Sequence, residues 1–295
     1  MSETINRHFE LGGDLRVSRL GFGAMRLPAS APGGPAADRG RSLDVLRRAV
    51  DLGVDHIDTA AFYFLGDLAA NDMIREALAP YPDGLVIATK VGPQKGPDDP
   101  VPTGQMEAGE LRAEVERNLT ELGLDRLDLV YLRPGGLEPP SAEESIAERF
   151  EVLAGLREEG LIRHLGVSHV TAGHVAEARA IAPVAAVQNW FDLTRPRDSA
   201  LLELCARDGI AYAPFFPLGG FGIPDHPRLK EVADRHGATV PQVLLAGLLA
   251  LSPAMLAIPG TSSPAHLEEN VAAADLHLTG EDLAVLAEIA ETPAA

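Results

Sequence analysis

The sequence has little cysteine, a shortage of basic residues and no long apolar run. Cys205 is the single cysteine among 295 residues, which excludes an intrachain disulfide and a cysteine-based metal site. The 25 Lys and Arg residues against 43 Asp and Glu give a formal net charge of -18, which opposes binding to nucleic acid or to an anionic membrane. The most apolar stretch, 243–251, is too short to span a bilayer. No basic segment followed by an apolar run stands at the start, so we expect a cytoplasmic protein.

What the chain does have is a regular alternation of short apolar segments, such as 85–90 and 127–132, with amphipathic segments, such as 107–122. Such alternation is typical of parallel strands joined by helices. About eight such units without a linker predict a single α/β domain over residues 1–295, a (β/α)8 TIM barrel with an N-terminal β-hairpin over 9–17. A dinucleotide-binding open sheet is less consistent, because no G-x-G-x-x-G loop follows a first strand.

Ionisable residues follow two neighbouring predicted strands. The segment 55–58 ends in Asp58 and is followed by Tyr63, and the segment 85–90 ends in Lys90. The carboxyl ends of parallel strands meet at one rim, so we expect these three side chains to lie together. An ammonium beside a phenol stabilises the phenolate, which makes a tyrosine useful as an acid near neutral pH. An ion pair that only holds the rim together would give the same spacing.

Most of the other predicted strands end in glycine or in a polar or aromatic residue, and in a barrel these ends converge on one mouth. Each alone could be an ordinary loop residue, but together they favour a ligand site. The four aromatic residues Phe62, Phe64, Trp190 and Phe221 either line this mouth, which would favour apolar or aromatic carbonyls, or pack the rim. The strand ends concerned are Gly23, Arg133, Ser168, Gln188, Phe215, Pro259 and Gly260.

Motifs spread over almost the full length resemble those of the aldo-keto reductases, in the same order. The resemblance implies NADPH-dependent reduction of a small-molecule aldehyde or ketone, without a metal. In this reaction Tyr63 would be the general acid, tuned by Lys90 and Asp58. The motifs are 20–26 (LGFGAMR), 53–60 (GVDHIDTA) with Tyr63, 87–90 (IATK), 166–168 (GVS), 187–189 (VQN), 217–220 (PLGG), 258–261 (IPGT) and 268–270 (EEN).

The resemblance also implies a binding site for NADP(H). Ser168 and Gln188 stand where family members bind the nicotinamide carboxamide, and His169 stands where many have asparagine. Phe215 takes the place of an aromatic ring that stacks on the nicotinamide. The implied cofactor-binding residues are Gly23, Met25, Arg26, Asp58, Ser168, His169, Gln188, Phe215, Phe216, Pro217, Leu218, Gly220, Pro259, Gly260, Thr261, Ser262, Ser263, His266, Glu269 and Asn270.

The sequence also departs from the family pattern at a catalytic position and at the 2′-phosphate site. Arg133 stands where the family usually has a catalytic histidine. Arginine donates hydrogen bonds and stays charged but cannot relay a proton, so we expect a functional substitute; a substrate-binding residue or a sign of weakened activity are the alternatives. Gly260 and His266 stand where many members bind the 2′-phosphate with Lys and Arg. The hydroxyl groups of 261–263, at a predicted helix N-terminus, still offer an anion site.

Two other functions fit parts of the sequence. A nicotinamide-cofactor-binding barrel could act as a sensor or auxiliary subunit with little turnover, and Arg133 leaves this alternative open. A metal-dependent barrel hydrolase would need clustered ligands, but residues such as His164, His169 and His174 lack the spacing of metal ligands. No motif names the physiological substrate or the oligomeric state.

Overall fold

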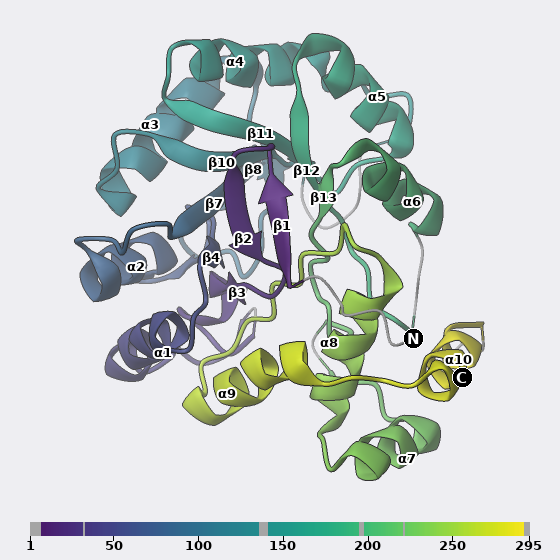
Figure 1. Cartoon of the computed structure of the whole chain (residues 1–295). Coiled ribbons are helices and arrows are strands. Elements are labelled where there is room, and N and C mark those ends of the chain that lie inside the picture. The colour runs from purple at the N-terminus through teal and green to yellow at the C-terminus, as the bar shows by residue number, and fades with distance from the viewer. Residues whose placement is uncertain (1–6, 32, 136–140, 195–197, 221, 292–295) are drawn as a thin grey trace.

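Seven parallel strands form a curled sheet at the centre of the computed structural model (Figure 1). The structure describes residues 7–31, 33–135, 141–194, 198–220 and 222–291. Adjacent strands pair in parallel register, with Ile57 opposite Ile87 and Val130 opposite Leu165. In spatial order the strands are β13 (Ala211–Tyr212), β12 (Val184–Gln188), β11 (Ile162–Ser168), β10 (Leu127–Leu132), β7 (Val86–Val91), β4 (His56–Asp58) and β3 (Phe22–Gly23).

Residues 254–259 close this sheet into a barrel, although only isolated bridges mark them as a strand. On one side the amide of Leu256 donates to the carbonyl of Tyr212 in β13 at 2.8 Å. On the other side the amide of Ala257 donates to the carbonyl of Arg19, and the amide of Gly21 donates to the carbonyl of Ala257, both at 2.8 Å. The segment thus takes the place of the eighth strand, and the predicted (β/α)8 barrel is confirmed.

A buried arginine stabilises this closure. The guanidinium of Arg19 donates to the carbonyls of Leu249 at 2.7 Å and Met255 at 3.1 Å, and also to that of Ser252. Burial lowers the pKa of Arg19 to about 10. Three carbonyl oxygens therefore compensate the charge that burial disfavours. They join the start of the first barrel strand to residues 249–255, which lead into the closing segment.

The predicted N-terminal hairpin consists of β1 (His8–Leu11) and β2 (Leu15–Ser18), and it lies across the ring of strands in Figure 1. Leu11 and Val17 are completely buried against side chains of the barrel interior, including Leu129. Since β2 leads directly into β3, the hairpin covers the amino-terminal end of the barrel. The opposite, carboxyl-terminal end is left for a site.

Helices surround the barrel and begin and end at local sequence signals (Figure 1). Thr239 caps the eighth helix, with Gln242 completing a capping box. Gly123 ends the third helix in the left-handed conformation, with φ of 66°, which glycine adopts without steric cost. The helices are α1 (Arg39–Asp51), α2 (Ala70–Leu78), α3 (Leu111–Leu122), α4 (Ala147–Glu158), α5 (Ala172–Ile181), α6 (Ser199–Asp208), α7 (Pro227–His236), α8 (Val240–Leu251), α9 (Pro264–Ala272) and α10 (Gly280–Glu291).

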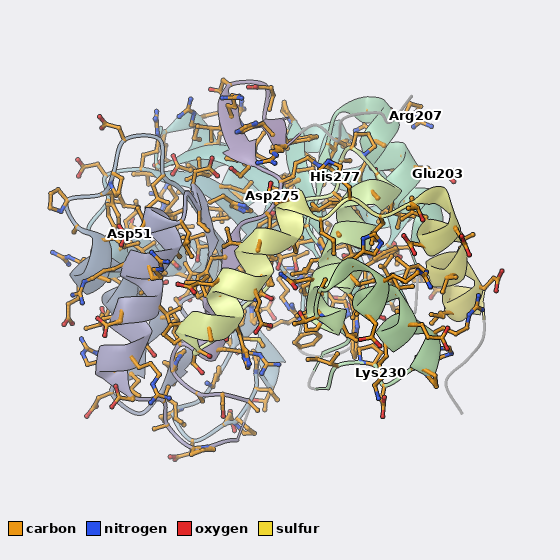
Figure 2. All side chains as sticks on the ribbon, turned by 60° about the horizontal axis from the view of Figure 1, so that its bottom comes forward. Asp51, Glu203, Arg207, Lys230, Asp275 and His277 are labelled. Carbon is orange, nitrogen blue, oxygen red and sulfur yellow. The ribbon has the colours of Figure 1, made fainter. Side chains whose placement is uncertain are left out.

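The strands pack apolar residues on both faces. One face meets the helices, where Ile87 and Val130 join a large core with residues such as Met73 of α2 and Phe150 of α4. Many charged residues lie on the outer surface: Figure 2 shows Arg207 and Lys230, among others, at the periphery. In the part of the chain described, no helix combines the length and the apolar character needed to cross a membrane.

The carboxyl-terminal end of the barrel carries two short hairpins that the sequence did not indicate. They are β5 (Phe64–Leu65) with β6 (Leu68–Ala69), and β8 (Pro93–Gln94) with β9 (Gly104–Gln105). In the regular sheet β13 ends at Tyr212. Ala213 and Phe215 still donate to the carbonyls of Val187 and Asn189, but Pro214 between them has no amide hydrogen to donate to the closing segment on the other side.

Candidate active site

A cavity of about 190 Å³ opens at the carboxyl-terminal end of the barrel. Its floor includes Asp58, Tyr63 and Arg133, which come from the ends of β4 and β10 and from the loop after β4. Its walls are mostly apolar and come from loops far apart in the sequence. They include Met25, Pro28, Phe62, Phe64, Leu65, Val101, Pro102, Trp190, Phe215, Phe216, Pro217 and Leu218. Phe62, Phe64 and Trp190 thus line the mouth as expected, whereas Phe221 lies outside the described residues.

The polar residues of the floor stand at inward-facing positions of the barrel. Side chains alternate along a strand, and Ala88 and Tyr131 belong to the interior cluster. Two residues further along their chains, Lys90 and Arg133 must therefore face inward, at the level of the mouth. Gly166 is required one level below Ser168, because a Cβ there would lie 2.6 Å from the ring of Tyr131. The same alternation brings Asp58, Ser168 and Gln188 to this level.

Lys90 and Asp58 form a buried ion pair. The Lys90 side chain is fully buried, and its Nζ lies 2.5 Å from Asp58 Oδ1 and 3.0 Å from the carbonyl of Thr59. Gln188 Nε2 donates to the other carboxylate oxygen of Asp58 at 2.8 Å. Burial alone would lower the pKa of Lys90, but Asp58 and Tyr63 outweigh it and raise that pKa, so the ammonium is kept charged.

Tyr63 lies over this pair. Lys90 Nζ is 4.9 Å from the centroid of the Tyr63 ring. The backbone of Tyr63 is fixed by hydrogen bonds with the carbonyl of Ala60 and the amide of Ala70, and Phe62 packs against its ring at 5.0 Å. The three side chains expected together from their strand ends are therefore neighbours, with the phenol on the cavity side.

Arg133 lines the cavity and does not point outward. Its guanidinium carbon is 4.9 Å from the centroid of the Phe215 ring, and its Nη2 is 3.5 Å from Nδ1 of His169. Burial lowers the pKa of Arg133, an effect that Tyr63 and Asp58 partly offset. A guanidinium retains its charge under this shift, so a fixed cation with several donors faces the same space as the phenol.

Two residues of this region have strained backbones. His169 and Phe216 have φ of 58° and 57°, although neither is glycine. The amide of His169 donates to the carbonyl of Gln188 at 2.8 Å, and that of Gly219 donates to Phe216 at 3.0 Å. Such conformations cost about 1–3 kcal/mol each and are concentrated at functional sites. No sequence signal distinguishes these two positions.

The residues expected to bind NADP(H) separate into three groups. Ser168, His169 and Gln188 lie buried beneath the mouth. A second group, within 261–270, lies beyond the cavity lining. Here α9 begins at the expected place, with Ser263 as its cap. The group that lines the cavity itself consists of Gly23, Met25, Arg26, Asp58, Phe215, Phe216, Pro217, Leu218, Gly220, Pro259 and Gly260.

Two of these glycines are required by the fold. A Cβ on Gly23 would lie 2.6 Å from the carbonyl oxygen of Ile258, and one on Gly260 would lie 2.5 Å from the carbonyl oxygen of Gly23. The backbones of β3 and of the closing segment therefore approach each other closely at the mouth. Barrel closure alone explains why no side chain fits at either position.

A buried network behind the ion pair was not indicated by the sequence. Thr59 and Thr89 adjoin the two charged residues and point to the opposite side of their strands. Thr59 donates to Asn71 of α2 at 2.8 Å, and Thr89 donates to Asn118 of α3 at 2.7 Å. The two asparagines are joined by a hydrogen bond of 3.2 Å. The network fixes β4 and β7 relative to each other and hence positions the ion pair.

Metal chemistry finds no support in the described residues. Within these ranges no group of three or more His, Cys, Asp or Glu side chains is placed to hold an ion. His164 contacts Asp14 of the hairpin at 2.5 Å, at the far end of the barrel.

The chain is similar to known proteins over most of its length. The model of the Aldo/keto reductase family matches residues 19–291. Pyridoxine 4-dehydrogenase of Escherichia coli (strain K12) is 48% identical over 276 residues, which cover 93% of this chain and 95% of that protein. NADH-specific methylglyoxal reductase of the same strain is 28% identical, with coverage of 94% and 96%. A crystal structure of an aldo/keto reductase from Klebsiella pneumoniae, in complex with NADP and acetate, is similar with a TM-score of 0.80 at 27% identity and covers 98% of this chain and 97% of that one.

Proposed function

The chain belongs to the aldo/keto reductase family and is an NAD(P)H-dependent oxidoreductase, and we propose that it reduces pyridoxal-type aromatic aldehydes with NADPH. The observation that carries the proposal is the buried Lys90–Asp58 pair directly beneath Tyr63 at the floor of a cavity with apolar walls. Burying two charges carries a desolvation penalty that their mutual attraction does little more than offset, so stability alone is a weak reason for such a pair. Here they lie against a phenol that can donate a proton.

The residues beneath the mouth suit a nicotinamide. Ser168 Oγ is buried and has no hydrogen-bond partner among the described residues, as expected for a group that binds a ligand amide. The Phe215 ring lines the cavity beside it and offers a face for stacking. The neighbouring structures solved with NADP or NADPH support the phosphorylated cofactor. When bound, NADPH supplies the hydride that reduces the carbonyl carbon.

The residues of this chain would supply the rest of the reaction. Tyr63 would donate a hydrogen bond to the carbonyl oxygen and then its phenolic proton, so that hydride and proton together convert the aldehyde to the alcohol and leave NADP⁺. Lys90 would stabilise the resulting phenolate, and Asp58 would hold Lys90 charged and in place. Reprotonation of Tyr63 from solvent through the open mouth would complete the cycle.

Arg133 would act on the same oxygen. Its fixed charge lies against Phe215 and His169, so the side chain is positioned before substrate arrives. Guanidinium donors would stabilise the negative charge that builds on the oxygen as hydride is transferred.

Replacement of Arg133 by methionine should therefore lower kcat by about 10²–10³-fold, the usual loss for one such donor, while the Kd for NADPH changes only a few-fold. Arg133→His should retain more activity than Arg133→Met. Arg126→Met, at an exposed position far from the cavity, is the matched control and should behave like wild type. Equal turnover of all these variants would remove Arg133 from the active site.

The relative at 48% identity is named a pyridoxine 4-dehydrogenase, and this supports an aromatic substrate. The flat walls formed by Phe64, Trp190 and Phe215 suit an aromatic ring better than a small aliphatic aldehyde.

The test is NADPH oxidation with pyridoxal, benzaldehyde and methylglyoxal, each repeated with NADH, together with NADP⁺ reduction by pyridoxine. We expect the highest kcat/KM for pyridoxal with NADPH. Faster turnover of methylglyoxal, or a preference for NADH, would contradict the proposal. NADPH binding without turnover of any of these aldehydes would instead favour a sensor or an auxiliary subunit.

A further inference from the structure

Lys95 and Asp99 line the outer part of the cavity and have no part in the reaction described above. Both lie between β8 and β9, and Pro100, Val101 and Pro102, which follow them, contribute apolar wall. The remaining charged residue of the outer wall, Arg26, is already engaged, because it donates to the carbonyls of Ser30 and Gly220 at 3.0 Å. The apolar outer wall therefore contains one cation, Lys95, and one anion, Asp99, that the proposed reduction does not use.

Lys95 is held at the edge of the catalytic floor. Its Nζ donates to the carbonyl oxygen of Phe64 at 2.5 Å and lies 4.2 Å from the centroid of the Phe64 ring. Phe64 follows Tyr63 in the chain, and Tyr63, Phe64 and Lys95 all line the same cavity. Burial lowers the pKa of Lys95, and Asp99 partly offsets this. Among the described residues the Phe64 carbonyl is the one hydrogen-bond acceptor for three N–H groups, which leaves donors for a ligand.

Asp99 is fixed by other partners. Its Oδ2 accepts hydrogen bonds from the amide of Gly96 at 3.0 Å and from Thr103 Oγ1 at 3.1 Å. A Cβ on Gly96 would lie 2.9 Å from this oxygen, so the close approach requires glycine. The Lys95 ammonium donates to the Phe64 carbonyl, and Asp99 acts on it only through its charge. The two opposite charges are thus held apart, each by its own contacts, in one wall.

We propose that Lys95 and Asp99 are specificity-determining residues that recognise an aromatic aldehyde carrying both an acidic oxygen and a basic ring nitrogen. This rests on the proposed function. Pyridoxal has a phenolic oxygen ortho to its aldehyde and a ring nitrogen para to it. With the carbonyl at Tyr63, the nearer Lys95 donates to the phenolic oxygen. Asp99, further along the loop, accepts from the protonated nitrogen, and the Phe64 ring packs beside the substrate.

Four aldehydes separate these contacts: benzaldehyde has neither group, salicylaldehyde only the ortho oxygen, 4-pyridinecarboxaldehyde only the para nitrogen, and pyridoxal both. Lys95→Met should raise KM about 10-fold for salicylaldehyde and pyridoxal. Asp99→Asn should do the same for pyridoxal, and for 4-pyridinecarboxaldehyde when it is assayed at acidic pH, where its ring nitrogen carries the proton that Asp99 accepts. Neither variant should change kcat/KM for benzaldehyde or the Kd for NADPH. Lys95→Arg should retain part of the preference, and Lys230→Met, at an exposed surface lysine, is the matched control.

An equal loss with all four aldehydes, or no loss with any, would overturn the assignment of Lys95 and Asp99. The proposed function fails differently, because it fails if wild-type protein does not reduce pyridoxal. The salicylaldehyde and 4-pyridinecarboxaldehyde comparisons still test the two residues in that case, since each is referred to benzaldehyde with the same protein.

Discussion

Tyr63→Phe should lower kcat for aldehyde reduction by about 10²–10⁴-fold, the usual contribution of a general acid, while the Kd for NADPH stays close to that of wild type. The phenol faces the cavity above the Lys90 ammonium, and phenylalanine keeps the ring but removes the proton donor. The ring contact with Phe62 is retained, so the thermal unfolding temperature should change little. Single-turnover measurements with saturating NADPH would follow the chemical step directly.

Tyr81→Phe is the matched control for this experiment. The Tyr81 hydroxyl donates to the carbonyl of Leu122 at 2.6 Å, away from the cavity, so its loss should leave kcat unchanged. A Tyr63→Phe protein that kept more than half of the wild-type activity would exclude Tyr63 as the acid, whatever the control did.

Lys90→Met should nearly abolish reduction and should also destabilise the protein. The ammonium lies between the phenol and Asp58, so its loss removes the charge that stabilises the phenolate. It also leaves Asp58 buried without its partner. Breaking a buried pair in this way typically costs about 3–5 kcal/mol in the free energy of unfolding, which chemical denaturation would measure.

The pH dependence of this stability loss follows from the Lys90 pKa. The pKa is raised above its ordinary value of 10.5 in the folded protein, so the contribution of the charged lysine is fully present below about pH 10.5. It is lost as the pH rises through the higher folded value. The difference in unfolding free energy between wild type and Lys90→Met should therefore narrow at strongly alkaline pH.

The double variant Lys90→Met with Asp58→Asn separates stability from chemistry. Removing both charges leaves no uncompensated ion in the barrel, so most of the lost stability should return. Activity should not return, because no cation remains beneath the phenol. Normal unfolding and normal reduction by Lys90→Met alone would show that the pair is neither stabilising nor catalytic.

Local sequence signals predicted most of the barrel because each acts within a few residues. Alternating segments set the order of strands and helices, and a glycine such as Gly123 ends a helix through its own backbone conformation. The closing segment, residues 254–259, was harder to recognise as a strand from the sequence. It holds its place through hydrogen bonds to Arg19 and Tyr212, more than forty positions away in the chain, whereas Pro214 beside it has no amide hydrogen to donate.

The floor of the site could be predicted because parallel strands place their carboxyl ends at one rim. Asp58 and Lys90 lie at neighbouring strand ends, and this fixed their contact before any packing was known. The direction of the Arg133 side chain could not be settled from the sequence alone. Its sequence position allowed an inward or an outward side chain, and the contact with the Phe215 ring decides in favour of the cavity.

The sequence by itself determined the barrel, the hairpin and the polar groups of the mouth, because these follow from strand periodicity and chain direction. Only the tertiary structure decided which common residues support and extend the site. Asn71 and Asn118 resemble ordinary helix residues until their hydrogen bonds behind the ion pair are seen. In the sequence, Lys95 and Asp99 look like ordinary charged residues of a surface loop. Only the pairing of β8 with β9 places them in the cavity wall. Their environment depends on contacts between separate loops, which no short-range pattern encodes.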